Sequence, residues 1–264
     1  MQRVTTLANY SDDRGNVIAY AGRIEQGVQI KFTGSNNVLE VDENARLGRL
    51  TIDFDCDNGK VVIGPSRGVP AFSASIRVGQ DSSVLIGANV STTTTCAMSA
   101  TEGTSIRIGN DVMIASENQI RADDGHPIFD VRTEKRVNVS KSIVIGDHVW
   151  LARAAVVLGG AEIGAGTVIG YGSIVTKRIP NNCVAAGIPA RVVRRDTAWE
   201  RPHLSLVKPY YKPDASSIKK SSRYWKLTEP ELTSRRSLPR RAARFIRRGL
   251  RAVRRDGLLF WLRR

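Results

Sequence analysis

Large aliphatic residues recur at every sixth position through the second half of the chain. The residue two places before each of them is smaller or β-branched, and the residue after it is usually glycine or alanine. Residues two apart point to the same side of a strand, so each hexad sends one bulky and one smaller side chain to one face. The uninterrupted series is Ile145, Leu151, Val157, Ile163, Ile169 and Val175.

This period predicts a β-helix. Each hexad is a short strand and a turn that form one flat face of a prism, and successive coils stack through parallel backbone hydrogen bonds. A single coil cannot bury its apolar face, so many coils must stack. The predicted fold class is therefore all-β, a left-handed parallel β-helix, which is an exception to the usual right-handed crossover.

The same period is less regular upstream. Ile108, Ile114 and Ile120 keep it, and weaker fragments occur between Val41 and Gly87. The intervals Ile86–Ile108 and Ile120–Ile145 are not multiples of six. We therefore expect residues to leave the coil in both intervals. The predicted parts are an N-terminal segment 1–34, a β-helix domain 35–195 with a loop at 127–142, an irregular segment 196–233 and a basic tail 234–264.

Composition is that of a globular protein, since 41% of the 264 residues are hydrophobic and 25% are charged. The formal net charge is +15, from 40 Lys and Arg against 25 Asp and Glu. Residues 234–264 hold 12 Arg and one Asp, which leaves only +4 for positions 1–233. The basic charge thus belongs to the tail, and no nucleic-acid partner is expected.

The chain carries no sign of secretion or of a membrane span. Cys56, Cys96 and Cys183 form no Cys-x-x-Cys pair, so neither disulfides nor a cysteine zinc site is expected. The N-terminal stretch lacks the apolar run of a signal peptide, and no apolar run approaches the ~20 residues that span a bilayer. We expect a cytoplasmic protein.

The basic tail has a helical pattern from Pro239 onward. Apolar residues form one stripe, most arginines lie off it, and the segment ends with Leu258–Leu262 followed by two arginines. A basic amphipathic helix over 239–264 is typical of a peripheral anchor at the inner face of the cytoplasmic membrane. Binding to an anionic polysaccharide and a disordered basic tail are the alternatives.

Several motifs fit one known family. They are residues 100–105, the run Asp123-Asp124-Gly125-His126-Pro127-Ile128, residues 144–150 ending in Trp150, residues 175–180 and residues 186–194. With these motifs the sequence resembles the hexapeptide-repeat acetyltransferases, and within them the enzymes that O-acetylate bacterial capsular or surface polysaccharides, polysialic acid included. The resemblance implies a homotrimer, acetyl-CoA in the groove between neighbouring β-helices, direct transfer without a covalent enzyme intermediate, and no metal.

His126 is the candidate general base. A sugar hydroxyl is a weak nucleophile at neutral pH, and an imidazole with a pKa near 6.5 can take its proton during attack on a thioester. His126 is in phase with Ile120, so we expect the coil to break at Asp124-Gly125 and turn the ring outward. Asp124, or Asp123, would orient the imidazole. Plain turn formation explains the two aspartates equally well.

Trp150 precedes the inward-facing Leu151, so its side chain points out of the prism. The resemblance implies that Trp150 shapes the catalytic site and lines the acetyl-CoA groove, whereas packing within the trimer is the alternative. It also places Lys177, Arg191 and Arg194 near the CoA phosphates. Along the pantetheine it places Arg153, Gly160, Tyr171 and Thr176. A solvated face is the alternative for each cation. Many relatives have a small residue in place of Tyr171, so this ring would narrow the channel.

Only two histidines besides His126 are present. His148 falls at a hexad corner and His203 lies beyond the coils, so we expect no metal site. The favoured function is an acetyl-CoA-dependent O-acetyltransferase acting on a sugar hydroxyl of a bacterial capsular or surface polysaccharide, with sialic-acid polymers among the candidates. The alternatives are an acetyltransferase of a small sugar or amino-sugar nucleotide, and a non-enzymatic β-helix scaffold at the membrane.

Overall fold

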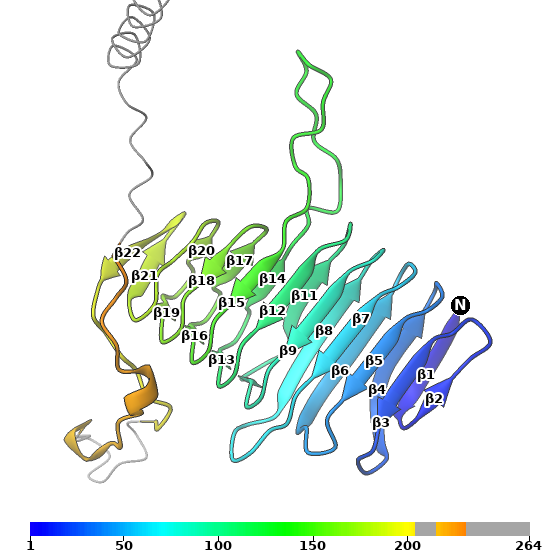
Figure 1. Ribbon diagram of the computed structural model, residues 1–264, viewed down its shortest axis with the longest axis horizontal. Coiled ribbons are helices and arrows are strands. Elements are labelled where there is room, and N and C mark those ends of the chain that lie inside the picture. Colours follow the sequence, from blue (N-terminus) through cyan, green and yellow to red (C-terminus); the bar gives the residue numbers. More distant parts are fainter. Residues whose placement is uncertain (204–214, 231–264) are drawn as a thin grey trace, which may run out of the picture. The chain divides into compact units, whose positions relative to one another are not determined.

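The computed structural model describes residues 1–203 and 215–230, and there short strands stack into three sheets that form the faces of a prism (Figure 1). The first sheet contains β1 (Gln2–Leu7), β4 (Glu25–Phe32), β6 (Leu47–Phe54), β8 (Phe72–Val78), β11 (Cys96–Ala100), β14 (Gln119–Arg121), β17 (Val156–Leu158) and β20 (Ile174–Val175). The second contains β2 (Tyr10–Ser11), β3 (Val17–Tyr20), β5 (Val38–Val41), β7 (Lys60–Ile63), β9 (Ser83–Ile86), β12 (Ser105–Ile108), β15 (Ile143–Ile145) and β18 (Glu162–Ile163). The third contains β10 (Ser91–Thr92), β13 (Met113–Ile114), β16 (Trp150–Leu151), β19 (Val168–Ile169), β21 (Val184–Gly187) and β22 (Ala190–Arg194).

The hexad series forms the core of the regular coils. Its six aliphatic residues are at most 2% exposed, and the smaller residues two places before them are fully buried as well. Successive coils are in parallel register, as in the partners Ile120, Val157 and Val175 along the first sheet. The predicted all-β fold, a β-helix of hexapeptide repeats, is confirmed.

The β-helix begins earlier than the predicted boundary at residue 35. β3 pairs in parallel with β5, and β4 pairs in parallel with β6, so residues 17–32 already belong to coils. β1 and β2 then run antiparallel to β4 and β3 and cover the first coil. The hexad signal is absent here because the sides are longer and the third side has no strand before β10.

One of the two expected insertions is absent. Between Ile86 and Ile108 the chain continues around the prism as β10 and β11, and both strands pair in parallel with neighbouring coils. The expectation that residues leave the coil here was therefore wrong. That coil is simply longer than the coil that leads from Ile145 to its partner Ile163, and β11 is correspondingly longer than β17. The second insertion is confirmed, since the chain leaves the prism between β14 and β15 as a projecting loop (Figure 1).

The chain after the last coil packs back on the prism. β22 runs antiparallel to β21, and the following residues contain the short 3₁₀ helices η2 (Ala215–Ser217) and η3 (Ser222–Tyr224). The rings of Trp199 and Tyr224 stack with the buried His148 ring, with centroids 4.1 and 4.3 Å away. Of the predicted irregular segment 196–233, the structure describes 196–203 and 215–230, and in these residues η2 and η3 are the only regular elements. The predicted basic tail, with the amphipathic helix predicted for it, lies outside the described residues. In the described part of the chain we find no helix of the length and apolarity that a membrane crossing requires.

Neighbouring residues of β15 provide a test of the core. Ile145 is 1% exposed and Val144 is 43% exposed. We expect Ile145→Ala to lower the free energy of unfolding by about 2–5 kcal/mol, because it leaves a cavity between stacked coils. Val144→Ala should cost less than about 0.5 kcal/mol. Urea denaturation followed by circular dichroism measures both, and equal losses would contradict the assigned inward and outward faces.

Candidate active site

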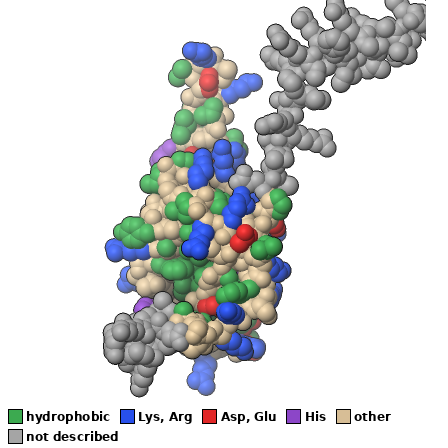
Figure 2. All heavy atoms as spheres, turned by 90° about the vertical axis from the view of Figure 1, so that its left-hand side faces the viewer, with side chains coloured by type: hydrophobic (Ala, Val, Ile, Leu, Met, Phe, Trp, Pro, Cys, Tyr) green, Lys and Arg blue, Asp and Glu red, His purple; other side chains and the backbone are tan. Residues whose placement is uncertain are grey.

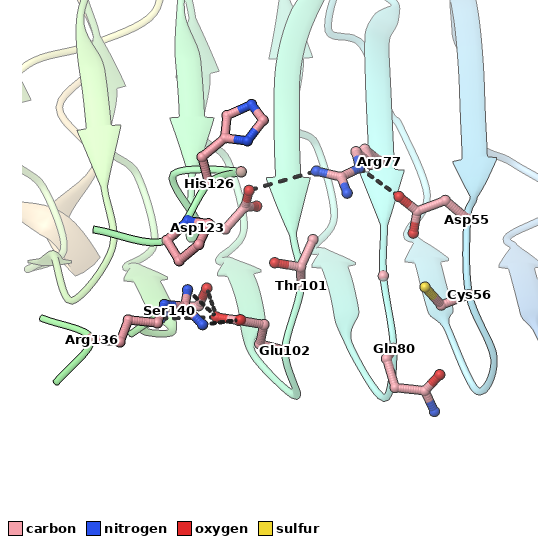
Figure 3. Close-up of a pocket in the computed structure, with 13 residues that line it drawn as sticks. Asp55, Cys56, Arg77, Gln80, Thr101, Glu102, Asp123, His126, Arg136 and Ser140 are labelled. Carbon is pink, nitrogen blue, oxygen red and sulfur yellow. Dashed lines mark hydrogen bonds and ion pairs between the residues drawn. The ribbon is translucent and has the colours of Figure 1, made fainter. Parts of the chain in front are cut away.

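A groove of about 410 Å³ runs along the corner where the chain passes from the first sheet to the second (Figure 3). It crosses the coils of β6, β8, β11 and β14, which at the usual strand spacing is a length of about 14 Å. The lining residues come from this corner and from the loop that follows β14. They are Asp55, Cys56, Arg77, Gly79, Gln80, Thr101, Glu102, Asp123, Gly125, His126, Pro127, Arg136 and Ser140.

His126 stands at one end of this groove, where the coil breaks. Ala122 and Asp123 are still buried after β14, whereas residues 124–128 are exposed. Gly125 has a φ of +76°, a left-handed conformation that glycine adopts without strain. The expected break at Asp124-Gly125 is therefore present. It moves His126 from its in-phase inward position to the surface of the groove.

The two aspartates before His126 anchor the loop. Asp123 Oδ2 accepts a hydrogen bond from Ser99 Oγ at 2.5 Å, and Asp123 Oδ1 lies 3.7 Å from an Arg77 Nη atom. Asp124 Oδ2 accepts from Asn138 Nδ2 at 2.9 Å, and the same amide donates to the His126 carbonyl oxygen at 2.8 Å. Within the described residues neither aspartate is hydrogen-bonded to the imidazole, which differs from the expected orienting contact. Both instead hold the backbone that carries it.

The returning arm of the loop is clamped by Glu102. Its carboxylate forms a two-point ion pair with Arg136 and accepts a hydrogen bond from Ser140 Oγ at 2.5 Å. The hydrogen bonds from Arg136 and Ser140 lower the pKa of Glu102 to about 2. The clamp is thus fully charged at neutral pH, and it ties the loop to the coil that carries β11 and β12.

Sequence reasoning did not find the charged row on the groove floor. Arg77 donates from Nε to Asp55 Oδ2 at 2.6 Å, and this bond raises the pKa of Arg77. Figure 3 shows its guanidinium between the carboxylates of Asp55 and Asp123. The three residues meet only because the wide coils place residues from separate turns of the chain side by side, at a spacing that the hexad period does not reveal. The one feature of the sequence that could have indicated this row is the presence of charged residues, Asp55, Arg77 and Asp123, at or near the ends of strands.

Trp150 lies away from the His126 groove. Its strand, β16, belongs to the third sheet, and its ring meets that of Trp199 at 5.9 Å. Trp150 lines a separate cavity of about 570 Å³ that includes Met113, Trp199 and Trp225. The outward orientation predicted for Trp150 is correct, since the ring is half-buried under the returning segment. Within a single chain, Trp150 and His126 therefore do not line the same site.

The residues expected to bind acetyl-CoA divide among three parts of the prism. Gly160, Thr176 and Lys177 continue the corner of the His126 groove into the later coils. The Gly160 N–H donates to the Ser142 carbonyl at 3.1 Å, so this amide is already used within the corner. Thr176 and Lys177 are exposed. The groove and these three residues lie along the same edge of the prism. The groove is on the coils before the loop, and the three residues are on the coils after it.

The other four candidates lie elsewhere. Arg153 and Tyr171 occupy the corner between the third and first sheets, where Arg153 pairs with Glu117 at 2.5 Å and Tyr171 is 70% exposed. Arg191 and Arg194 are exposed on β22. Lys and Arg side chains are spread over this end of the β-helix among hydrophobic and uncharged ones (Figure 2).

His148 serves the packing of the returning segment. Its Nδ1 lies 2.6 Å from Asp111 Oδ2, and its Nε2 lies 2.9 Å from the Trp199 carbonyl oxygen. Burial raises the pKa of Asp111, but hydrogen bonds from His148 and Arg201 outweigh it and lower the pKa overall. In the ranges 1–203 and 215–230, no three His, Cys, Asp or Glu side chains cluster in a way that could hold a metal ion.

Comparison with known proteins identifies the family. The model for "Bacterial transferase hexapeptide (six repeats)" matches residues 142–177. A polysialic acid O-acetyltransferase of Escherichia coli O1:K1 is 40% identical over 101 residues, which are 38% of this chain and 33% of that protein. The crystal structure of the polySia-specific acetyltransferase NeuO superposes with a TM-score of 0.65 and 33% identity, over 75% of this chain and 92% of that one. The chain belongs to the hexapeptide-repeat acetyltransferases.

Similarity to other members of this family is shorter. A galactoside O-acetyltransferase of Escherichia coli K12 is 44% identical over 89 residues, 34% of this chain and 43% of that protein. The chain thus spans less than half the length of these two curated relatives.

The Glu102 clamp predicts how firmly the loop is held. Because the pKa of Glu102 is lowered, the clamp stabilises the loop above the ordinary glutamate pKa of 4.5 and is lost as the pH falls toward 2. At pH 7 we expect Glu102→Gln to release the loop, so that trypsin cuts after Arg132 and Lys135 several times faster than in the unmodified chain. Glu134→Gln, at the exposed tip, is the matched control. Equal cutting rates in all three proteins would show that the clamp does not restrain the loop.

Proposed function

We propose that the chain is an acetyl-CoA-dependent O-acetyltransferase that modifies a sugar hydroxyl of a bacterial capsular or other surface polysaccharide. The observation that carries this proposal is His126. Its imidazole is exposed at the end of a long groove, on a loop held by three separate contacts, and it lies in the motif on which the family resemblance rests. The names of the relatives support an O-acetyl transfer and a polysaccharide acceptor.

In the proposed reaction His126 acts as general base. A ring nitrogen takes the proton of the sugar hydroxyl while the hydroxyl oxygen bonds to the thioester carbonyl carbon. The carbon–sulfur bond then breaks, and the imidazolium returns the proton to the CoA sulfur. Acetyl moves from sulfur to oxygen without a covalent enzyme intermediate. Asp124 contributes by holding Asn138, and through it the backbone of His126.

The two substrates would approach His126 from opposite ends of one corner. Gly160, Thr176 and Lys177 lie on the later coils, where the exposed ammonium of Lys177 suits a phosphate of CoA. The groove lies on the earlier coils and is the acceptor side. Its length of three coil steps favours a polymer over a free monosaccharide, which makes an acetyltransferase of small sugars the second candidate.

We further propose that the active unit is a homotrimer. His126 and Trp150 lie on different parts of one prism, so a neighbouring copy has to supply the second residue if both contact the same substrates. Arg153, Tyr171, Arg191 and Arg194 would reach acetyl-CoA in the same way. The loop also exposes a row of apolar side chains that a second copy would cover, namely Ile128, Phe129, Val131, Val137 and Val139.

Replacing His126 tests the reaction. We expect His126→Ala to lower the rate of acetyl transfer about 10²–10⁴-fold, the usual contribution of a positioned base, while acetyl-CoA still binds. The measurement is release of CoA with a panel of polysaccharides, followed by NMR location of the new acetyl groups. Lys135→Ala, at the loop tip, is the control and should retain full rate. Undiminished transfer by His126→Ala would refute the assigned base, and failure of the unmodified chain to bind acetyl-CoA would favour a scaffold.

We propose from its sequence that the Arg-rich tail, residues 234–264, holds the protein at an anionic membrane surface. Its charge of +11 and its apolar end suit a leaflet that contains anionic lipids. Deleting 234–264 should abolish co-sedimentation with vesicles of phosphatidylglycerol and phosphatidylcholine and leave acetyl transfer in solution unchanged. If the deletion instead weakens binding to an anionic polysaccharide and not to vesicles, the tail binds the acceptor. If the deletion changes neither assay, the tail has no binding role.

A further inference from the structure

The floor of the groove is a row of three charges on the coils of β6, β8 and β14, and the coil of β11 lies between the last two. Asp55 follows β6, Arg77 lies in β8, and Asp123 follows β14. The Asp123 side chain is only 2% exposed, and the Asp55 side chain is 23% exposed. The remaining oxygen of each carboxylate, Oδ1, is buried and accepts no hydrogen bond in the described part of the chain. These two carboxylates therefore face Arg77 and are less exposed than it is.

Arg77 is the group of this row that a ligand can reach. Its side chain is 47% exposed and lines the groove. Nε is engaged by Asp55, whereas neither Nη atom is hydrogen-bonded to a described residue. A guanidinium is a flat fork of donors, and two flanking carboxylates fix its orientation. Arg77 thus offers oriented N–H groups to oxygen atoms in the groove (Figure 3).

The charges around Arg77 determine which kind of ligand oxygen it can bind. Arg136 and Glu102 neutralise each other in their two-point ion pair. The row itself carries two negative charges and one positive charge, so the groove is negative overall when His126 is neutral. A carboxylate that approached Arg77 would be repelled by Asp55 and Asp123 at close range. A hydroxyl or ring oxygen accepts from Arg77 without that cost.

We infer that Arg77 recognises the acceptor, and that the sugar unit it holds beside His126 is uncharged. This inference rests on the proposed function and gives the acceptor class for the same groove. It sets this chain apart from relatives named for polysialic acid, whose every unit carries a carboxylate. Asp55 and Asp123 are positioning residues in this scheme because they act through Arg77.

The first test compares acceptors of different charge. The full chain is incubated with acetyl-CoA and two sets of bacterial polysaccharides of similar length, one uncharged and one with a carboxylate on every unit, and acetyl incorporation is measured. We expect at least about tenfold faster transfer to the best uncharged polymer, with a KM that does not change between low and high salt, because no charge on the acceptor is there to be screened. A faster transfer to carboxylated polymers would overturn the inference and leave the proposed function intact. Transfer to no polymer in either set would overturn both.

The second test separates recognition from folding. Arg77→Lys keeps the positive charge between the two carboxylates and removes the fork of donors. On the preferred polymer we expect it to raise the KM for the acceptor about tenfold, the cost of a lost hydrogen bond to a charged group, with the KM for acetyl-CoA unchanged. Arg107→Lys, on the outer face of β12 and exposed, is the control. An unchanged acceptor KM in a folded Arg77→Lys protein would overturn the role of Arg77.

Discussion

Parallel hydrogen bonding between successive coils is the constraint on which the rest of this molecule depends. Each coil offers its backbone groups to the next, and the buried aliphatic of every hexad keeps the two in register. The corners therefore lie above one another, and residues that are far apart in the chain become neighbours, as Ile86 does with Ile108 and Ile108 with Ile145. The groove is one such corner.

The regular coils could be predicted because their period is short and uninterrupted. The prediction failed where the sides lengthen, since a coil whose length is not a multiple of six has no simple repeat and resembles an insertion. The break before His126 was predictable for the opposite reason. A titratable ring in an inward phase, preceded by Asp-Gly, conflicts with the core, and Gly125 resolves that conflict with its left-handed backbone.

The charged contacts of the site were the least predictable part. Glu102 meets Arg136, which lies 34 residues later in the returning arm of the loop, and Asp123 meets Ser99 of the neighbouring coil. Each pairing depends on lengths of coil and loop that the sequence leaves open. Asp123 and Asp124 are adjacent and identical in type, yet one is buried against Ser99 and the other is exposed beside Asn138. Their difference arises from where the coil ends, which only the stacked structure defines.

The unequal coils divide the prism into two regions along its axis. The coils before the loop are wide and irregular, whereas the coil from Ile145 to Ile163 is narrow and keeps the hexad period on every side. A wide coil can gain or lose a residue at a corner and still pair with its neighbours, whereas in a narrow, strictly periodic coil the same change would shift every inward side chain out of phase. In the proposed function the acceptor side is thus built where the fold tolerates variation, and the donor side where it does not. A proposed enzyme of this design would be able to change the sugar it modifies while keeping the same acyl donor.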